Sequence, residues 1–234
     1  MTKLIPLSVL LALVCGCMVF PTGARELETF SYRGINQVEV KAEFLAVEVS
    51  TGSESAVAMT SELPDESVTG PRNYTVKHEV VGSRLVVWVE RDPGTWSVVG
   101  GGRLLFVVPD GTTLSVETVS GSARVDGLET ASLRVSSVSG SISLEDFQGA
   151  LSAQTVSGAI DCRAMDLDGD SSLTTISGSI SVRFSSPLEG YRFELSSVSG
   201  NLTVGSIRAA KGLRVGSGAV RVRGETVSGS QTYR

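Results

Sequence analysis

The sequence predicts an all-β protein folded as a β-solenoid, a single-stranded β-helix-like stack of turns about twenty residues long. A Val-Ser-Gly or Ile-Ser-Gly tripeptide recurs in the second half of the chain, and apolar residues alternate with polar residues on both sides of it. The tripeptides end at Gly121, Gly140, Gly158, Gly178, Gly200 and Gly229, with a degenerate Gly-Ser-Gly that ends at Gly218. From Gly121 to Gly218 these glycines lie 19, 18, 20, 22 and 18 residues apart. Such a period is typical of stacked supersecondary units.

The start of the chain has the pattern of an export signal, which we place within residues 1–24. One positive charge, at Lys3, precedes an apolar run at 4–14 that is too short to span a bilayer as a helix. A small residue before Cys17 resembles the bacterial lipoprotein cleavage site, at which the cysteine becomes N-terminal and lipidated. We therefore predict a membrane-anchored envelope lipoprotein cleaved before Cys17. The alternatives are cleavage after Ala24, which gives a secreted or periplasmic protein, and an uncleaved anchor.

The first half of the folded part contains β-strands without a regular period. Alternating and β-branched runs predict strands at 38–44, 45–49, 74–80, 85–89 and 104–108. We expect a less regular N-terminal β capping region, residues 30–110, to pass without a linker into the regular repeats, residues 111–234. Residues 25–234 are therefore predicted to form a single domain.

Each repeat is expected to supply two short strands and a corner. In one repeat, Leu133 and Val135 alternate in phase with Ser137, whereas Val138 and Ile142 follow the opposite phase. If all apolar residues point inward, the backbone turns between Ser137 and Val138, and the following glycine accommodates the corner. Val, Ile and Leu would then stack in interior columns beside a ladder of corner serines at 139, 157, 177 and 199. A twisted sandwich of the same strands is the alternative.

The chain offers little catalytic chemistry. His78 is the single histidine and lies between two charged residues of a predicted strand, where a solvated position is expected. The corner serines recur in every repeat, so their cause is architectural and they are not nucleophiles. Cys162 takes the position that Leu144 and Val182 occupy in other repeats, which favours a buried small hydrophobe over a reactive thiol. No cofactor is expected.

The distribution of charged residues indicates which classes of partner the protein could bind. The net charge of −5 argues against nucleic acid. The last 34 residues nevertheless carry six cations against Glu225 alone: Arg208, Lys211, Arg214, Arg221, Arg223 and Arg234. This basic end could attract an anionic polymer or lipid headgroups, or it could keep the last turns soluble and prevent end-to-end stacking.

Three groups of residues are candidate sites. Asp166, Asp168 and Asp170 alternate around a glycine and could bind calcium weakly, although the EF-hand pattern is not met and a solvated turn is the competing interpretation. Trp96 lies beside three glycines in a loop, where it could contact a sugar or a protein groove, or fold back over the stack. Arg221 and Arg223 are the remaining candidates for partner contact.

The order of these motifs resembles a known family of exported bacterial proteins, the putative-adhesin β-strand-repeat family. It is a domain family of unknown function related to the head domains of autotransporter adhesins. The resemblance rests on Val38-Glu-Val, Val47-Glu-Val, Leu85-Val-Val, the Val-Val-Pro-Asp-Gly segment at 107–111, and the Ser-Gly series that opens at Leu114. It covers residues 30 to 230 approximately and implies an envelope or surface protein with no catalytic residues.

We therefore expect a non-enzymatic cell-envelope lipoprotein that uses an adhesin-like solenoid for binding or as a scaffold. Its partners would be a membrane, through the lipid at Cys17, and an unidentified protein or envelope polymer. A polysaccharide-active β-helix enzyme is the first alternative. The second is a purely structural protein that self-associates through an open C-terminal edge at 226–233.

Overall fold

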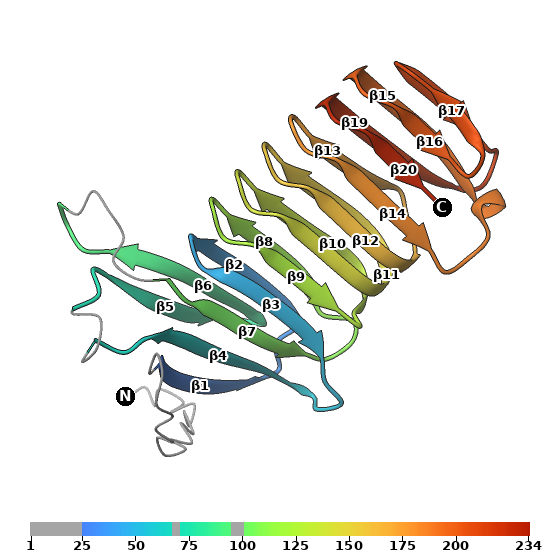
Figure 1. Cartoon of the computed structure of the whole chain (residues 1–234). Helices are drawn as coiled ribbons and strands as arrows, with labels where there is room; N and C mark the ends of the chain where they lie inside the picture. The colour runs from blue at the N-terminus through green and yellow to red at the C-terminus, as the bar shows by residue number, and fades with distance from the viewer. Residues whose placement is uncertain (1–24, 67–70, 95–100) are drawn as a thin grey trace, which may run out of the picture.

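A computed structural model describes residues 25–66, 71–94 and 101–234 of the chain. Almost every described segment is a β-strand or a turn between strands, and a short 3-10 turn, η1, lies at Leu188–Gly190. The prediction of an all-β protein is confirmed. Figure 1 shows the strands stacked side by side along one long axis.

The strand bounds are as follows. In chain order the strands are β1 (Arg25–Arg33), β2 (Gln37–Glu43), β3 (Ala46–Thr51), β4 (Ala56–Pro64), β5 (Tyr74–Val81), β6 (Arg84–Arg91), β7 (Arg103–Val108), β8 (Thr113–Thr118), β9 (Ala123–Asp126), β10 (Glu129–Ser137), β11 (Ile142–Thr155), β12 (Ile160–Asp166), β13 (Ser171–Thr175), β14 (Ile180–Phe184), β15 (Tyr191–Ser199), β16 (Leu202–Val204), β17 (Ile207–Ala209), β18 (Gly212–Val215), β19 (Val220–Ser228) and β20 (Gln231–Tyr233).

Parallel pairing arranges most of these strands in two rows. The first row runs β6, β2, β8, β10, the second half of β11, β13, β19 and β15. The second row runs β7, β3, β9, the first half of β11, β12, β14, β20 and β16. One strand of each row, joined through a corner, makes a rung.

The order of the rungs in space differs from their order in the chain. The β2–β3 rung lies between β6–β7 and β8–β9, and the β19–β20 rung lies between β13–β14 and β15–β16. The expectation that residues 226–233 form an open C-terminal edge is therefore wrong, because β19 and β20 are paired on both sides. Self-association by another route stays a prediction.

Antiparallel strands close both ends of the stack. At the N-terminal end β5 pairs with β6, β4 with β7, and β1 with β4. At the other end β17 pairs with β16 and β18 with β15. The region at 30–110 thus supplies the cap, as expected, but it also contributes two parallel rungs to the stack itself.

Apolar side chains fill the space between the two rows in columns that run from rung to rung. Leu133 pairs with Leu114 on one side and Leu151 on the other, and Ile160 pairs with Ile142 and Ile180. All of these side chains are buried. The expected interior columns are confirmed, and they place the polar alternate positions on the two outer faces.

The corners differ from the expectation that every apolar residue points inward. The hydroxyl residue before each Val-Ser-Gly or Ile-Ser-Gly is buried, as at Ser137, Thr155 and Thr175, whereas the following Val or Ile is exposed. The Thr155 hydroxyl accepts a hydrogen bond from the Gly158 amide (3.0 Å) and donates to the Gly140 carbonyl of the previous rung (3.3 Å). A buried hydroxyl at this position satisfies backbone amide and carbonyl groups of the corner, which a methyl group could not do.

Glycine is required at the corners because successive rungs approach backbone to backbone. A Cβ on Gly158 would collide with the Gly140 carbonyl, and one on Gly178 would collide with the Gly158 carbonyl. A Cβ on Gly229 would likewise collide with the Gly178 carbonyl, and one on Gly200 would collide with the Gly229 carbonyl. These contacts agree with the position of β19–β20 between β13–β14 and β15–β16. The degenerate tripeptide at 216–218 lies elsewhere, packed against Gly190 and Tyr191.

Replacing Gly158 with Ala should lower the free energy of unfolding by about 3 kcal/mol, because neither backbone can retreat without breaking contacts between rungs. Urea unfolding followed by circular dichroism measures the change. Gly190→Ala is the matched control, since a Cβ there meets open space, and its stability should stay within about 0.5 kcal/mol of wild type. Equal stability of the two variants would contradict a corner that only glycine fits.

Candidate functional site

Two of the predicted site residues, Cys17 and Trp96, lie outside the described residues. The others can be placed. Arg221 and Arg223 lie on β19 with exposed side chains, and each is paired with a carboxylate: Arg221 with Asp170 at 2.7 Å and Arg223 with Glu225 at 3.0 Å. Their charges are thus compensated locally, which weakens them as candidates for partner contact.

The three aspartates proposed for calcium make other interactions. Asp166 accepts hydrogen bonds from the hydroxyls of Ser186 (3.1 Å) and Tyr191 (3.3 Å), and Asp170 binds Arg221. Within 25–66, 71–94 and 101–234, no three His, Cys, Asp or Glu side chains gather in a way that could hold a metal ion. The structure therefore does not bring Asp166, Asp168 and Asp170 together as a calcium site.

His78 is packed within the N-terminal cap. Its Nδ1 lies 2.8 Å from the Tyr32 hydroxyl, and its ring centroid lies 4.4 Å from that of Phe30. Burial lowers the pKa of His78 and raises the pKa of Tyr32 to about 12. Both groups are therefore uncharged near neutral pH, as suits a packing contact.

Cys162 lies on β12 between Leu144 and Val182 and is fully buried. Burial raises the pKa of its thiol well above the ordinary range of cysteine. The interpretation as a small interior hydrophobe is confirmed.

The most distinctive exposed feature is a line of apolar side chains along the corners, which we call the corner ridge. In spatial order it consists of Val119, Val138, Val156, Ile176, Val227 and Val198. Their exposed fractions run from 40% at Val156 to 70% at Val198. An exposed serine follows each of them. The ridge is therefore apolar along its crest, with hydroxyl groups along the side that follows it in sequence.

Backbone hydrogen bonds between rungs fix the spacing of the corner ridge. The Ser139 amide donates to the Val119 carbonyl (2.7 Å), the Ser177 amide to the Val156 carbonyl (2.8 Å), and the Ser228 amide to the Ile176 carbonyl (2.7 Å). Five steps at the usual strand spacing of about 4.8 Å give a ridge about 24 Å long. The sequence analysis did not predict the corner ridge. The available signal was the Ser or Thr before every Val-Ser-Gly or Ile-Ser-Gly, because a hydroxyl residue there can take the interior position.

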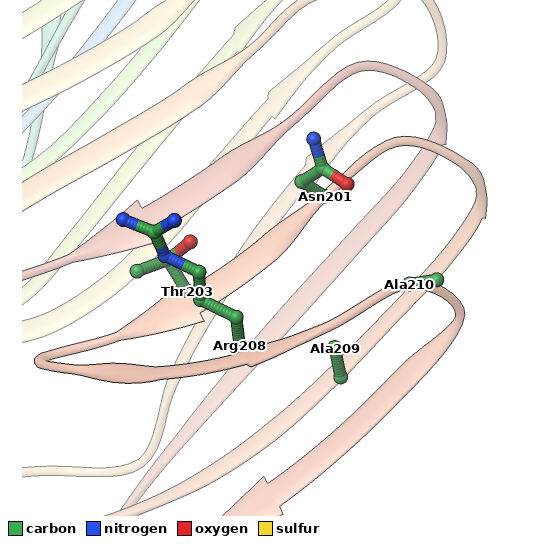
Figure 2. Close-up of a pocket in the computed structure, with 5 residues that line it drawn as sticks. All are labelled: Asn201, Thr203, Arg208, Ala209 and Ala210. Carbon is green, nitrogen blue, oxygen red and sulfur yellow. The ribbon is translucent and has the colours of Figure 1, made fainter.

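A shallow hollow of about 340 Å³ lies near the C-terminal end of the second row, lined by Asn201, Thr203, Arg208, Ala209 and Ala210. Figure 2 shows the Arg208 side chain extending over β16 toward Thr203. Arg208 and Thr203 are direct partners across β17 and β16, so their side chains share the outer face. The hollow offers one guanidinium group, a hydroxyl and an amide.

Comparisons with known proteins agree with this architecture. Residues 35–230 match the model of a family described as Toastrack DUF4097. A structure of a putative cell adhesion protein from Clostridium sporogenes superposes with a TM-score of 0.55 at 12% identity, covering 89% of this chain and 98% of that one. A putative adhesin from Bacteroides fragilis gives a TM-score of 0.50 at 12% identity, covering 91% and 99%. At such identities the likeness concerns the fold. No curated protein matches the sequence.

Among the described residues, no helix has the length and apolar character needed to cross a membrane.

Cys162 should be inert in the folded protein, because its thiol is buried and stays protonated. In a Cys15→Ala/Cys17→Ala variant it is the only cysteine left. A thiol reagent at about pH 8 should leave the native variant unlabelled and label it fully in urea. Labelling of the native protein at the rate of a free cysteine would contradict this placement.

Proposed function

The chain belongs to the Toastrack DUF4097 family, and we propose that it is a non-enzymatic binding protein of the bacterial cell envelope. The two similar structures carry the names of adhesion proteins, not of enzymes, and this supports the proposal by analogy of fold. The observation that carries the proposal is the corner ridge.

The corner ridge has the properties of a protein-binding surface. Contiguous exposed apolar side chains on a soluble domain mark interaction sites more often than isolated ones do. Val and Ile are stiff at χ1, so ordering them on binding costs little conformational entropy. The rungs fix their spacing, so a partner meets a preformed surface. Because serines and no charged groups follow the ridge residues, we propose that the partner is a protein with an apolar groove.

Lipidation at Cys17 would place this surface at the envelope. The lipoprotein cleavage pattern precedes the folded region by only a few residues, so the anchor would hold the N-terminal end of the stack near a membrane. The corner ridge runs along the stack axis and would then extend away from the anchor.

The anchor can be tested by metabolic labelling with a palmitate analogue. Wild type should incorporate the label and Cys17→Ala should lose it, because the lipid is attached to that thiol. Cys15→Ala, two residues away, is the control and should keep the label. An unlabelled wild type would refute the lipoprotein assignment.

The corner ridge can be tested with a variant that changes polarity and keeps shape. Val138→Thr/Val156→Thr/Ile176→Thr retains β-branched side chains while adding hydroxyls. We expect the purified variant to bind isolated envelopes at least about tenfold more weakly than wild type, as measured by saturation binding. Protease treatment of the envelopes should abolish wild-type binding, because the proposed partner is a protein.

Val80→Thr/Val81→Thr/Val107→Thr is the matched control, since these three valines are also exposed but lie on β5 and β7, away from the corners. Its binding should equal that of wild type. Binding that survives the ridge substitutions, or that resists protease, would show that the ridge is not the site.

A further inference from the structure

Three arginines from distant parts of the chain lie close together on the outer face of the second row, and two of them, Arg183 and Arg234, are direct neighbours. Cys162, Val182 and Tyr233 are aligned partners on β12, β14 and β20. The residue after each of them is an exposed arginine: Arg163, Arg183 and Arg234. The register of β12 and β14 shifts after Cys162, so Arg163 lies at this irregularity and is not an aligned partner of Arg183. The Arg234 amide donates to the Val182 carbonyl (2.9 Å), and the Phe184 amide donates to a main-chain oxygen of Arg234 (2.7 Å), which fixes Arg234 beside Arg183. Neighbouring positions are separated by the strand spacing of about 4.8 Å.

Two of the three arginines in this column, Arg183 and Arg234, carry charges that are uncompensated among the described residues. Arg163 pairs with Asp161 on its own strand, at 3.0 Å between exposed side chains. Arg183 and Arg234 take part in none of the ion pairs found in the part of the chain that the structure describes. Like charges on directly adjacent strands repel and destabilise a sheet. The fold therefore carries the adjacent cations Arg183 and Arg234 at a cost, whereas Arg221 and Arg223 on the first row are each paired with a carboxylate.

Arg208 extends this cationic surface at the end of the stack. It lies across β17 and β16 from Thr203, in the hollow of Figure 2, and it too has no ion pair among the described residues. We call Arg163, Arg183, Arg234 and Arg208 the arginine strip. In Figure 1 these residues belong to the yellow-to-red end of the molecule, on β12, β14, β17 and the chain end after β20.

A row of hydroxyl groups runs beside the arginine strip. Ser181, Thr232 and Thr203 are aligned partners on β14, β20 and β16. Ser181 and Thr232 precede Arg183 and Arg234 by two residues and so share their outer face. The surface therefore alternates guanidinium groups with hydroxyls that can both donate and accept hydrogen bonds.

We propose that the arginine strip binds a linear acidic polysaccharide that carries carboxylate groups along its chain. Each guanidinium group can hold a carboxylate through two parallel hydrogen bonds, and the hydroxyl row can bind sugar hydroxyls between them. The polymer would run along the stack axis and meet Arg163, Arg183 and Arg234 in turn, and then Arg208 beyond β16. This ligand and this face are separate from the corner ridge, so the proposal does not depend on the proposed function.

The neighbourhood of the arginine strip favours a narrow polymer over a wide anionic surface. Beyond Arg163 the same column continues with Glu145 and Asp126, on β11 and β9. Glu145 is paired with Arg124 at 3.1 Å, but the exposed Asp126 carboxylate would repel a bilayer or a nucleic-acid duplex laid across the face. A single flexible chain can follow the cations and avoid the acidic end.

The test measures binding of the full chain to oligogalacturonate by isothermal titration calorimetry. Wild type should bind, with an affinity that falls as salt rises from about 50 to about 200 mM, because the contacts are ionic. The fully methyl-esterified oligomer, which lacks only the charges, should not bind. Arg183→Gln/Arg234→Gln should weaken binding by about tenfold or more.

Arg221→Gln/Arg223→Gln is the matched control, since it removes the same two charges from the paired arginines of the first row. It should bind within about threefold of wild type. Thermal unfolding provides a second readout: Arg183→Gln/Arg234→Gln should melt at or above the wild-type temperature, because it relieves repulsion.

Several outcomes would overturn the proposal. They are the absence of wild-type binding at millimolar oligogalacturonate, equal losses in the two variants, or a lower melting temperature for Arg183→Gln/Arg234→Gln. Tighter binding to vesicles containing an anionic phospholipid or to single-stranded DNA, lost in the same variant, would assign the arginine strip to that other partner and refute the polysaccharide.

Discussion

The close approach of backbones at the corners is the constraint on which the rest of the structure depends. Glycine carbonyls of one rung occupy the space that a Cβ of the next rung would need, and buried hydroxyls such as Thr155 satisfy the amides and carbonyls there. This contact sets the distance between rungs and therefore the spacing of every column, apolar inside and polar outside. The distance between rungs therefore also sets the spacing of neighbouring residues in the corner ridge and in the arginine strip.

Much of the fold could be predicted from the sequence, because period, alternation and glycine position are local signals. The strands, the buried columns around Leu133 and Ile160, and the burial of Cys162 all followed from them. The outward orientation of Val138 could not be predicted from these signals, because the alternation of apolar residues does not show which backbone groups of a tight corner require hydrogen bonds. Ser137 fills the interior position there because its hydroxyl satisfies the backbone.

The candidate surfaces were harder to predict, because they depend on which rungs are neighbours. Near-identical repeats can pair in several orders, and nothing local specifies that β20 lies beside β14. Arg183 and Arg234 are therefore adjacent in space while 51 positions apart in the sequence. Arg221 and Arg223 form a basic pair in the sequence, but in the fold each of them is paired with a carboxylate. Charge on a solenoid must be assessed by column and not by segment.

The inserted position of β19–β20 has a consequence for how the chain becomes a folded protein. β19 and β20 complete the interior of the stack, so β13–β14 and β15–β16 can join through this shared rung only after residues 220–233 are present. Such closure brings together segments distant in sequence and is slow to form. Folding of the stack is therefore complete only once β19–β20 has inserted, and the inserted rung, paired on both sides, is protected from fraying.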